Sequence, residues 1–224
     1  MSLRSSVLLR SVAVACLGLT STAVVDVHAG PIENYIPNGS SHTVKTVEED
    51  WELVVGDVDS NLVAPQIVML MSPVNSADGQ HMLVTLNHGD QPAYSAGGLQ
   101  LQAWDGDTLV NAERHSDEGV LSTDAETVTW TQRIDVAANG LEYSVRNGSS
   151  ATWGQFGGSG QFKVTVPSTT TSLNQYNPHV TFINSGVSFA ANRVASLKLK
   201  KVRVTLENGQ QYEFSINAEL NGNN

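Results

Sequence analysis

Residues 126–146 alternate between apolar and polar side chains almost without interruption. One face of the first half carries Val128, Trp130, Ile134 and Val136, with Gln132 as the exception. The turn residues Asn139-Gly140 accept positive φ angles, and a return segment with the same alternation follows at 141–146. A period of two is typical of strands with one buried face, so this stretch predicts a β-hairpin whose apolar face packs on a second layer.

The polar face of the predicted hairpin carries Arg133, Asp135, Glu142 and Arg146. We expect cross-strand ion pairs on a solvated outer face rather than a binding face, because exposed pairs are common and each contributes only ~0–1 kcal/mol. A second turn is predicted at 147–150. A Gly-rich loop that carries Trp153 follows it.

The rest of the chain also reads as short strands separated by Gly, Asn, Asp and Pro. Strands are predicted at 51–55, 66–71, 81–88, 99–104, 108–112, 161–166, 179–184, 197–206 and 211–216, and no window is convincingly helical. The apolar phase slips at Lys200-Lys201, which predicts a β-bulge there. The expected fold is all-β, a two-sheet antiparallel β-sandwich of the jelly-roll or concanavalin A-like kind.

The chain ends have their own composition. Residues 1–29 combine Arg4 and Arg10, a short apolar run and the sequence Val27-His28-Ala29, and they predict a secretory signal peptide. We expect a flexible N-terminal arm at 30–46, a single domain at 47–217 and a disordered tail at 218–224. The single cysteine, Cys16, lies in the predicted leader, so the exported chain would hold no disulfide.

The charge balance narrows the classes of partner. The formal net charge is −10, which disfavours nucleic acid and anionic lipid as partners. From the predicted leader peptide, we expect a secreted or periplasmic protein that does not remain in the membrane after cleavage of the leader.

Two charged segments leave alternatives open. Six acidic residues between Glu48 and Asp59 suggest either an edge strand protected by charge or a calcium site, for which Asp57 and Asp59 are the candidate ligands. Apart from that calcium site, no cofactor is expected. Five basic residues lie in 193–203 and suggest a lysine-protected strand beside an acidic partner such as 48–59, or a basic binding patch.

The predicted binding site consists of Trp104 with Gln100 and Gln102 on one strand face, and of Trp153 in its loop. An exposed aromatic ring can stack on a sugar, and amides can bind the hydroxyls. Trp51 and Trp130 are in phase with apolar neighbours and are expected in the core. The partner suggested by these features is a polysaccharide or a cell-envelope polymer.

Two other functions remain open besides non-catalytic polymer binding. One is a structural or adhesive envelope protein. The other is a glycan-active hydrolase, for which Glu48 with Asp50 and Asp105 with Asp107 are possible carboxylate pairs. The sequence contains no nucleophile elbow, phosphate loop, dinucleotide fingerprint or HExxH motif, and we favour a protein that is not an enzyme.

Several segments together resemble a family of uncharacterised exported bacterial proteins of the planctomycete type. They are 48–54, 64–66, 98–102, 130–133, 147–150, 153–154 and 192–193. The resemblance implies secretion and one compact domain, and it implies no activity. At the level of fold, the expected sandwich is similar to concanavalin A-like lectin and glucanase domains, which does not determine a function.

Overall fold

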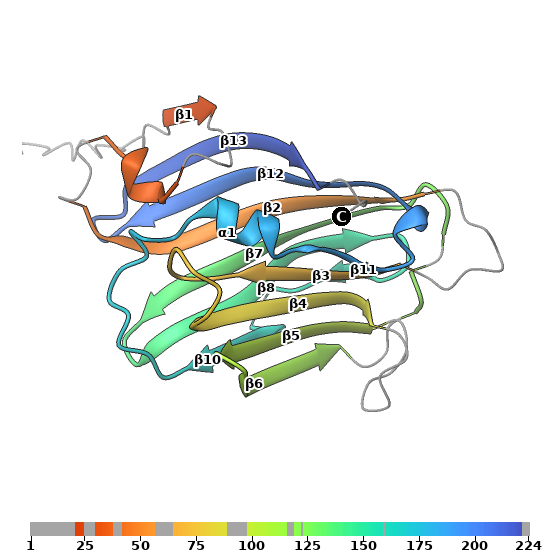
Figure 1. Cartoon of the computed structure of the whole chain (residues 1–224), viewed down its shortest axis with the longest axis horizontal. Helices are drawn as coiled ribbons and strands as arrows, with labels where there is room; N and C mark the ends of the chain where they lie inside the picture. The colour runs from red at the N-terminus through yellow and green to blue at the C-terminus, as the bar shows by residue number, and fades with distance from the viewer. Residues whose placement is uncertain are drawn as a thin grey trace, which may run out of the picture.

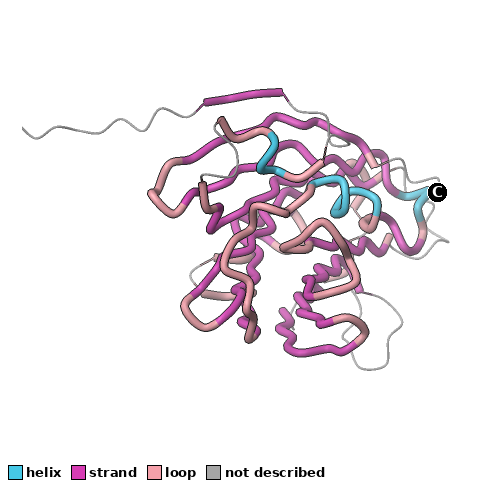
Figure 2. Tube along the Cα trace, turned by 60° about the vertical axis from the view of Figure 1, so that its left-hand side comes forward, coloured by secondary structure: helices cyan, strands magenta, loops and turns pink. Residues whose placement is uncertain are grey.

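Two packed β-sheets form the molecule. The computed structural model describes residues 21–24, 30–37, 42–56, 65–88, 98–115, 119–121, 123–158 and 160–220. The larger sheet has the strand order β1-β13-β12-β2-β7-β8-β10, with β9 paired to β8, and the smaller sheet has the order β11-β3-β4-β5-β6. Figure 1 shows the smaller sheet in front of β7, β8 and β10, and Figure 2 shows the two layers from the side. The prediction of an all-β, two-sheet antiparallel sandwich is confirmed; among the described strands, only the short β1–β13 pair is parallel.

The strands of the larger sheet are β1 (Ser21–Val24), β2 (Val44–Val55), β7 (Thr127–Ala137), β8 (Gly140–Ser150), β9 (Gly154–Phe156), β10 (Lys163–Val166), β12 (Val194–Leu206) and β13 (Gln211–Glu219). Those of the smaller sheet are β3 (Gln66–Met71), β4 (Gln80–His88), β5 (Gly98–Asp105), β6 (Thr108–His115) and β11 (Gly186–Phe189). The described part of the chain also contains three short helices: η1 (Ile32–Asn34), α1 (Pro178–Ile183) and η3 (Ala191–Arg193).

The apolar faces of both sheets meet in one core. In the larger sheet, the predicted phase of the hairpin places Trp130 inside, where its ring stacks on that of Trp51 with the centroids 6.4 Å apart. Both tryptophans are therefore core residues, as predicted. The smaller sheet contributes the side chains Ile67, Met69, Met71, Met82, Val84, Leu86, Leu99, Leu101 and Ala103.

Side chains join the two sheets where β6 lies beside β10. The Glu113 carboxylate of β6 accepts hydrogen bonds from the backbone N–H groups of Phe162 (2.9 Å) and Lys163 (2.7 Å). Asn111 donates to the carbonyl of Thr165. These side-chain hydrogen bonds take the place of a backbone hydrogen-bond ladder between β6 and β10. This side of the sandwich is therefore closed without strand pairing.

The central hairpin forms as predicted, with its turn between Ala137 and Gly140. The second predicted turn, at 147–150, is wrong: β8 continues through it to Ser150, and the register shifts opposite Trp130. Asn147, at φ 53°, occupies this bulge. The turn-like residues allow β9 to approach, since a Cβ at Gly148 would lie 2.2 Å from the Phe156 ring.

The strand β12 carries the bulge that the phase slip predicted. Its register shifts between Leu199 and Lys201 against both neighbours, β13 and β2. The basic residues of β12 lie beside the acidic residues of β2, as expected for the lysine-protected alternative. The edge-strand alternative for the acidic segment is wrong, because β2 is a central strand between β12 and β7.

The segment 179–184 was predicted as a strand and is instead the helix α1. Asn177 caps it by accepting the N–H of His179 at 3.0 Å, and Pro178 occupies the first turn. An Asn-Pro pair is a helix-start signal, so local capping overrides the apolar run here. No helix in the described ranges is long and apolar enough to cross a bilayer.

Regular structure also occurs at the predicted arm and tail. The helix η1 lies within 30–46, β2 begins at Val44, and β13 ends at Glu219. The strand β1 lies within the predicted leader and pairs with β13 over Tyr212–Ser215. The other residues of that leader are outside the described part of the chain.

Candidate binding site

The predicted site on β5 is largely buried. Gln100 and Gln102 are only 2% and 9% exposed, and Trp104 is half-buried. The expectation that these side chains form an open polar face is therefore wrong for the two glutamines. Neither amide atom of Gln100 has a hydrogen-bond partner, and the indole N–H of Trp104 is also buried without one.

Trp153 is anchored in the fold rather than displayed. It is 8% exposed, donates its indole N–H to the carbonyl of Gly119 at 2.7 Å, and packs edge-on against Phe156. Its turn is held by Glu126, which accepts from the hydroxyls of Ser150 and Thr152. Burial would raise the pKa of Glu126, but these hydrogen bonds outweigh it and lower the pKa. The buried ring offers no open stacking surface.

The candidate calcium ligands Asp57 and Asp59 lie outside the described residues. Within the described ranges, no group of three or more His, Cys, Asp or Glu side chains could hold a metal ion.

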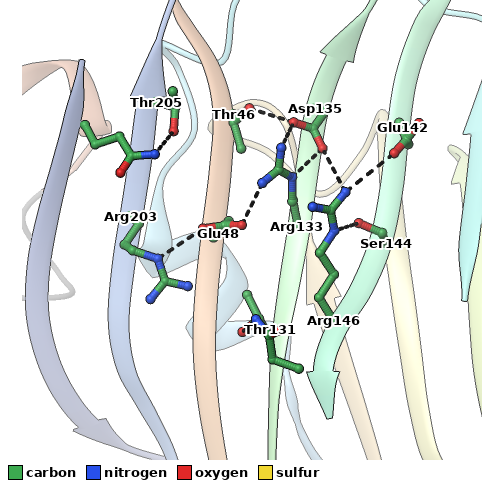
Figure 3. Close-up of polar contacts among 12 residues, drawn as sticks. Thr46, Glu48, Thr131, Arg133, Asp135, Glu142, Ser144, Arg146, Arg203 and Thr205 are labelled. Carbon is green, nitrogen blue, oxygen red and sulfur yellow. Dashed lines mark hydrogen bonds and ion pairs between the residues drawn. The ribbon is translucent and has the colours of Figure 1, made fainter. Parts of the chain in front are cut away.

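The outer face of the larger sheet carries a continuous network of ion pairs (Figure 3). Arg133 forms two hydrogen bonds with Asp135, at 2.5 and 2.6 Å, and one with Glu48 at 2.7 Å. Arg203 bridges Glu48 and Asp50 from the next strand. The chain of contacts continues through Arg146, Glu142 and Lys163.

A hollow of about 320 Å³ opens on this face. Its charged lining consists of Asp50, Glu52, Lys200 and Arg203, and each of these charges has an opposite partner within the lining. Asp50 and Glu48, one of the candidate carboxylate pairs, are thus bound to arginine. This hollow is charged but balanced, so we do not assign the binding site to it.

A larger hollow, of about 570 Å³, lies where the strand ends of both sheets meet; we call it the loop-end hollow. It is lined by the β3–β4 loop, the ends of β4 and β5, the β7–β8 turn and the segment after β10. The lining residues are Pro73, Val74, Gln80, Asp105, Asn139, Pro167, Ser168, Thr169 and Thr170.

Close backbone contacts fix the walls of this hollow. Gly140, at φ 140°, lets the β7–β8 turn approach the end of β10, because a Cβ there would lie 2.0 Å from the carbonyl oxygen of Val166. The N–H of Gly106 donates to Gly79, and the Gln80 amide donates to Pro167 at 2.8 Å. Each wall is therefore tied to a neighbour, and the hollow is preformed.

The chemistry of the loop-end hollow is polar and free of cations. It offers one carboxylate, two amides and three hydroxyls beside proline and valine, and none of its lining residues is basic. The hydroxyl of Tyr143, which does not line the hollow, is buried and has no hydrogen-bond partner. Burial, and secondly the Asp105 carboxylate, raise the pKa of Tyr143, so the hydroxyl stays protonated.

Sequence reasoning placed Asp105 only in a turn and in a possible carboxylate pair. The signal for this site was the set of polar residues at four strand ends, but the strand pairing that brings them together could not be read from the chain. No protein-family description, characterised protein or solved structure matches this chain at a significant level.

Proposed function

We propose that the protein is a secreted, non-catalytic β-sandwich that binds a neutral carbohydrate or similar polyhydroxylated polymer in the loop-end hollow. The observation that carries the proposal is a preformed polar hollow whose single carboxylate, Asp105, has amides and hydroxyls beside it and no basic residue in the lining. Polar groups that converge in a preformed hollow are typical of small-ligand sites.

The lining supports an uncharged ligand. Carboxylate, amide and hydroxyl groups accept and donate hydrogen bonds to sugar hydroxyls, and Pro73 and Pro167 provide apolar surface for ring carbons. A carboxylate with no cation beside it repels anionic groups, so acidic polysaccharides fit this hollow poorly. The acidic net charge of −10 acts in the same direction at long range.

The test is a binding survey with neutral and acidic glycans, followed by titration calorimetry on any that bind. We expect neutral glycans to bind and Asp105→Asn to weaken binding at least about tenfold, since hydrogen bonds to charged groups contribute ~1.5–3 kcal/mol. Asp107→Asn is the matched control, because Asp107 lies in the same turn but does not line the hollow. Absence of neutral-glycan binding, or equal affinity for Asp105→Asn and wild type, would refute the proposal.

A further inference from the structure

One buried carboxylate of β2 lies on the side of the sheet opposite the charged outer face. Glu49, on the inner side of β2, is 0% exposed. It accepts a hydrogen bond from the indole N–H of Trp51 at 3.0 Å and another from the Tyr176 hydroxyl. Burial raises the pKa of Glu49 to about 7, although these two hydrogen bonds favour the ionised form.

The surroundings of Glu49 contain no positive charge among the described residues. Gln132 of β7 and Val202 of β12 lie opposite it in the sheet, and Thr181 of α1 is buried on the same side. None of these three ionises. Tyr176 is the titratable group that faces the carboxylate, and its own pKa is raised well above its usual range, chiefly by burial. An ionised Glu49 therefore keeps its hydrogen-bond donors but has no opposite charge beside it, and burial disfavours it unless water reaches it.

The segment that covers Glu49 also builds the loop-end hollow. Tyr176 lies six residues after Thr170, which lines one wall. Its neighbour Asn177 donates to the side chain of Asn75 at 2.7 Å, next to Val74 in a second wall. Movement of Tyr176 away from β2 would therefore admit water to Glu49 and disturb two walls together.

We infer that Glu49 is a positioning residue for the loop-end hollow: its protonated carboxyl holds the Tyr176 segment closed, and its ionisation favours opening of that segment. We call the contact between Glu49 and Tyr176 the latch. Its role in regulating ligand binding rests on the proposed function, whereas the pH-dependent opening of the latch does not. The open state exposes Glu49 to water, and its pKa there approaches the ordinary 4.5. Between that value and about 7, the closed state binds a proton that the open state lacks, so rising pH favours opening.

Hydrogen exchange of the full chain without ligand tests the latch directly. After correction for intrinsic exchange rates, the opening equilibrium of amides in 168–177 should rise by up to about tenfold per pH unit between pH 5 and 7, then level off. Glu49→Gln should remove this dependence and keep the segment closed. Glu207→Gln, which removes an exposed carboxylate, should behave as wild type. A flat wild-type profile, or the same slope in Glu49→Gln, would overturn the inference.

A second measurement connects the latch to binding. Neutral hexaoses of glucose, mannose and xylose are added at pH 7.5, and exchange in 72–79 and 168–177 is followed. A hexaose that occupies the hollow should slow exchange in both segments, because it binds the closed state and lowers the population of the open one. If a hexaose binds without changing either segment, the coupling is refuted. If none binds, the proposed function fails while the pH profile still decides the latch.

Discussion

Two hollows of this protein differ in whether the charged residues that line them form ion pairs. On the outer face of the larger sheet, Asp50, Glu52, Lys200 and Arg203 line a hollow in which each charge meets an opposite one. In the loop-end hollow, Asp105 has no basic neighbour in the lining. The first surface has its electrostatic interactions completed by the fold. The second has interactions left for another molecule to complete.

The difference shows why charge density alone is a poor guide to function. The outer face of the larger sheet is rich in charged side chains, yet its arginines and carboxylates satisfy one another. Half-exposed pairs of this kind contribute little individually. A single unbalanced carboxylate in a polar hollow carries more information about ligand binding.

The largest expected effect tests whether the loop-end hollow depends on close backbone contact. Gly140→Ala places a methyl group against the carbonyl of Val166 in a φ region that alanine rarely adopts. We expect a loss of about 3–5 kcal/mol in the free energy of unfolding, measured by urea denaturation. Gly186→Ala, where a Cβ meets nothing within 4 Å, is the control and should change stability little. Equal stability of the two variants would mean that the hollow is not held by this contact.

The second-largest effect is a pH dependence of stability, which is expected from the buried carboxylate of Glu49 and not from the ion-paired carboxylates of the outer face. Glu49 has its folded pKa raised from 4.5 to about 7, so the folded state binds the extra proton in that window. Stability should therefore be highest below pH 4.5 as far as this group is concerned, fall as pH rises towards 7, and level off above it. The loss is about 3 kcal/mol at most. Glu49→Gln should flatten this part of the profile in urea denaturation between pH 4.5 and 8; an unchanged profile would contradict the burial of the charge.

A smaller effect is expected on the outer face. Arg133→Met removes the bonds to Glu48 and Asp135 while it keeps an unbranched apolar stem on the strand. Because Arg203 still contacts Glu48 and Thr46 still contacts Asp135, the cost should be about 1 kcal/mol. The difference from wild type should shrink in 1 M NaCl, since salt screens half-exposed pairs. A loss above about 3 kcal/mol would show that the network is more than a solvated face.

The smallest expected effect concerns the buried hydroxyl of Tyr143. Tyr143→Phe removes a hydroxyl that has no partner, so the unfolding free energy should change by about 0.5 kcal/mol or less. Affinity for a neutral glycan should equal that of wild type, because Tyr143 does not line the loop-end hollow. Thermal denaturation and calorimetry on the same preparation provide both numbers. A clear loss of affinity would show that the ligand is bound by more than the lining of the hollow.

Much of the fold could be predicted because its signals are local. The alternation at Val128 and Trp130 and the Asn139-Gly140 turn determined the hairpin, and the phase slip at Lys200 determined the bulge. The helix α1 was missed because the apolar run was weighed above the Asn177 cap. The turn at 147–150 was wrong because Asn and Gly serve a bulge as well as a turn.

The site was harder to predict, for a physical reason. The alternation of apolar and polar residues along β5 indicated which side of the strand Gln100 faces. It did not indicate that this face of β5 is also buried. The hollow joins Asp105 to Asn139 and Thr169, which are distant in sequence. Only the pairing of strands across two sheets brings them together, and that pairing is a property of the whole chain.

The Glu113 bridge has a consequence for how the protein behaves at high concentration. By occupying the backbone donors of Phe162 and Lys163, its carboxylate leaves those two positions of β10 unable to template a neighbouring chain. The bridge thereby blocks one route by which sheets from separate molecules merge, and it favours individual particles over fibres.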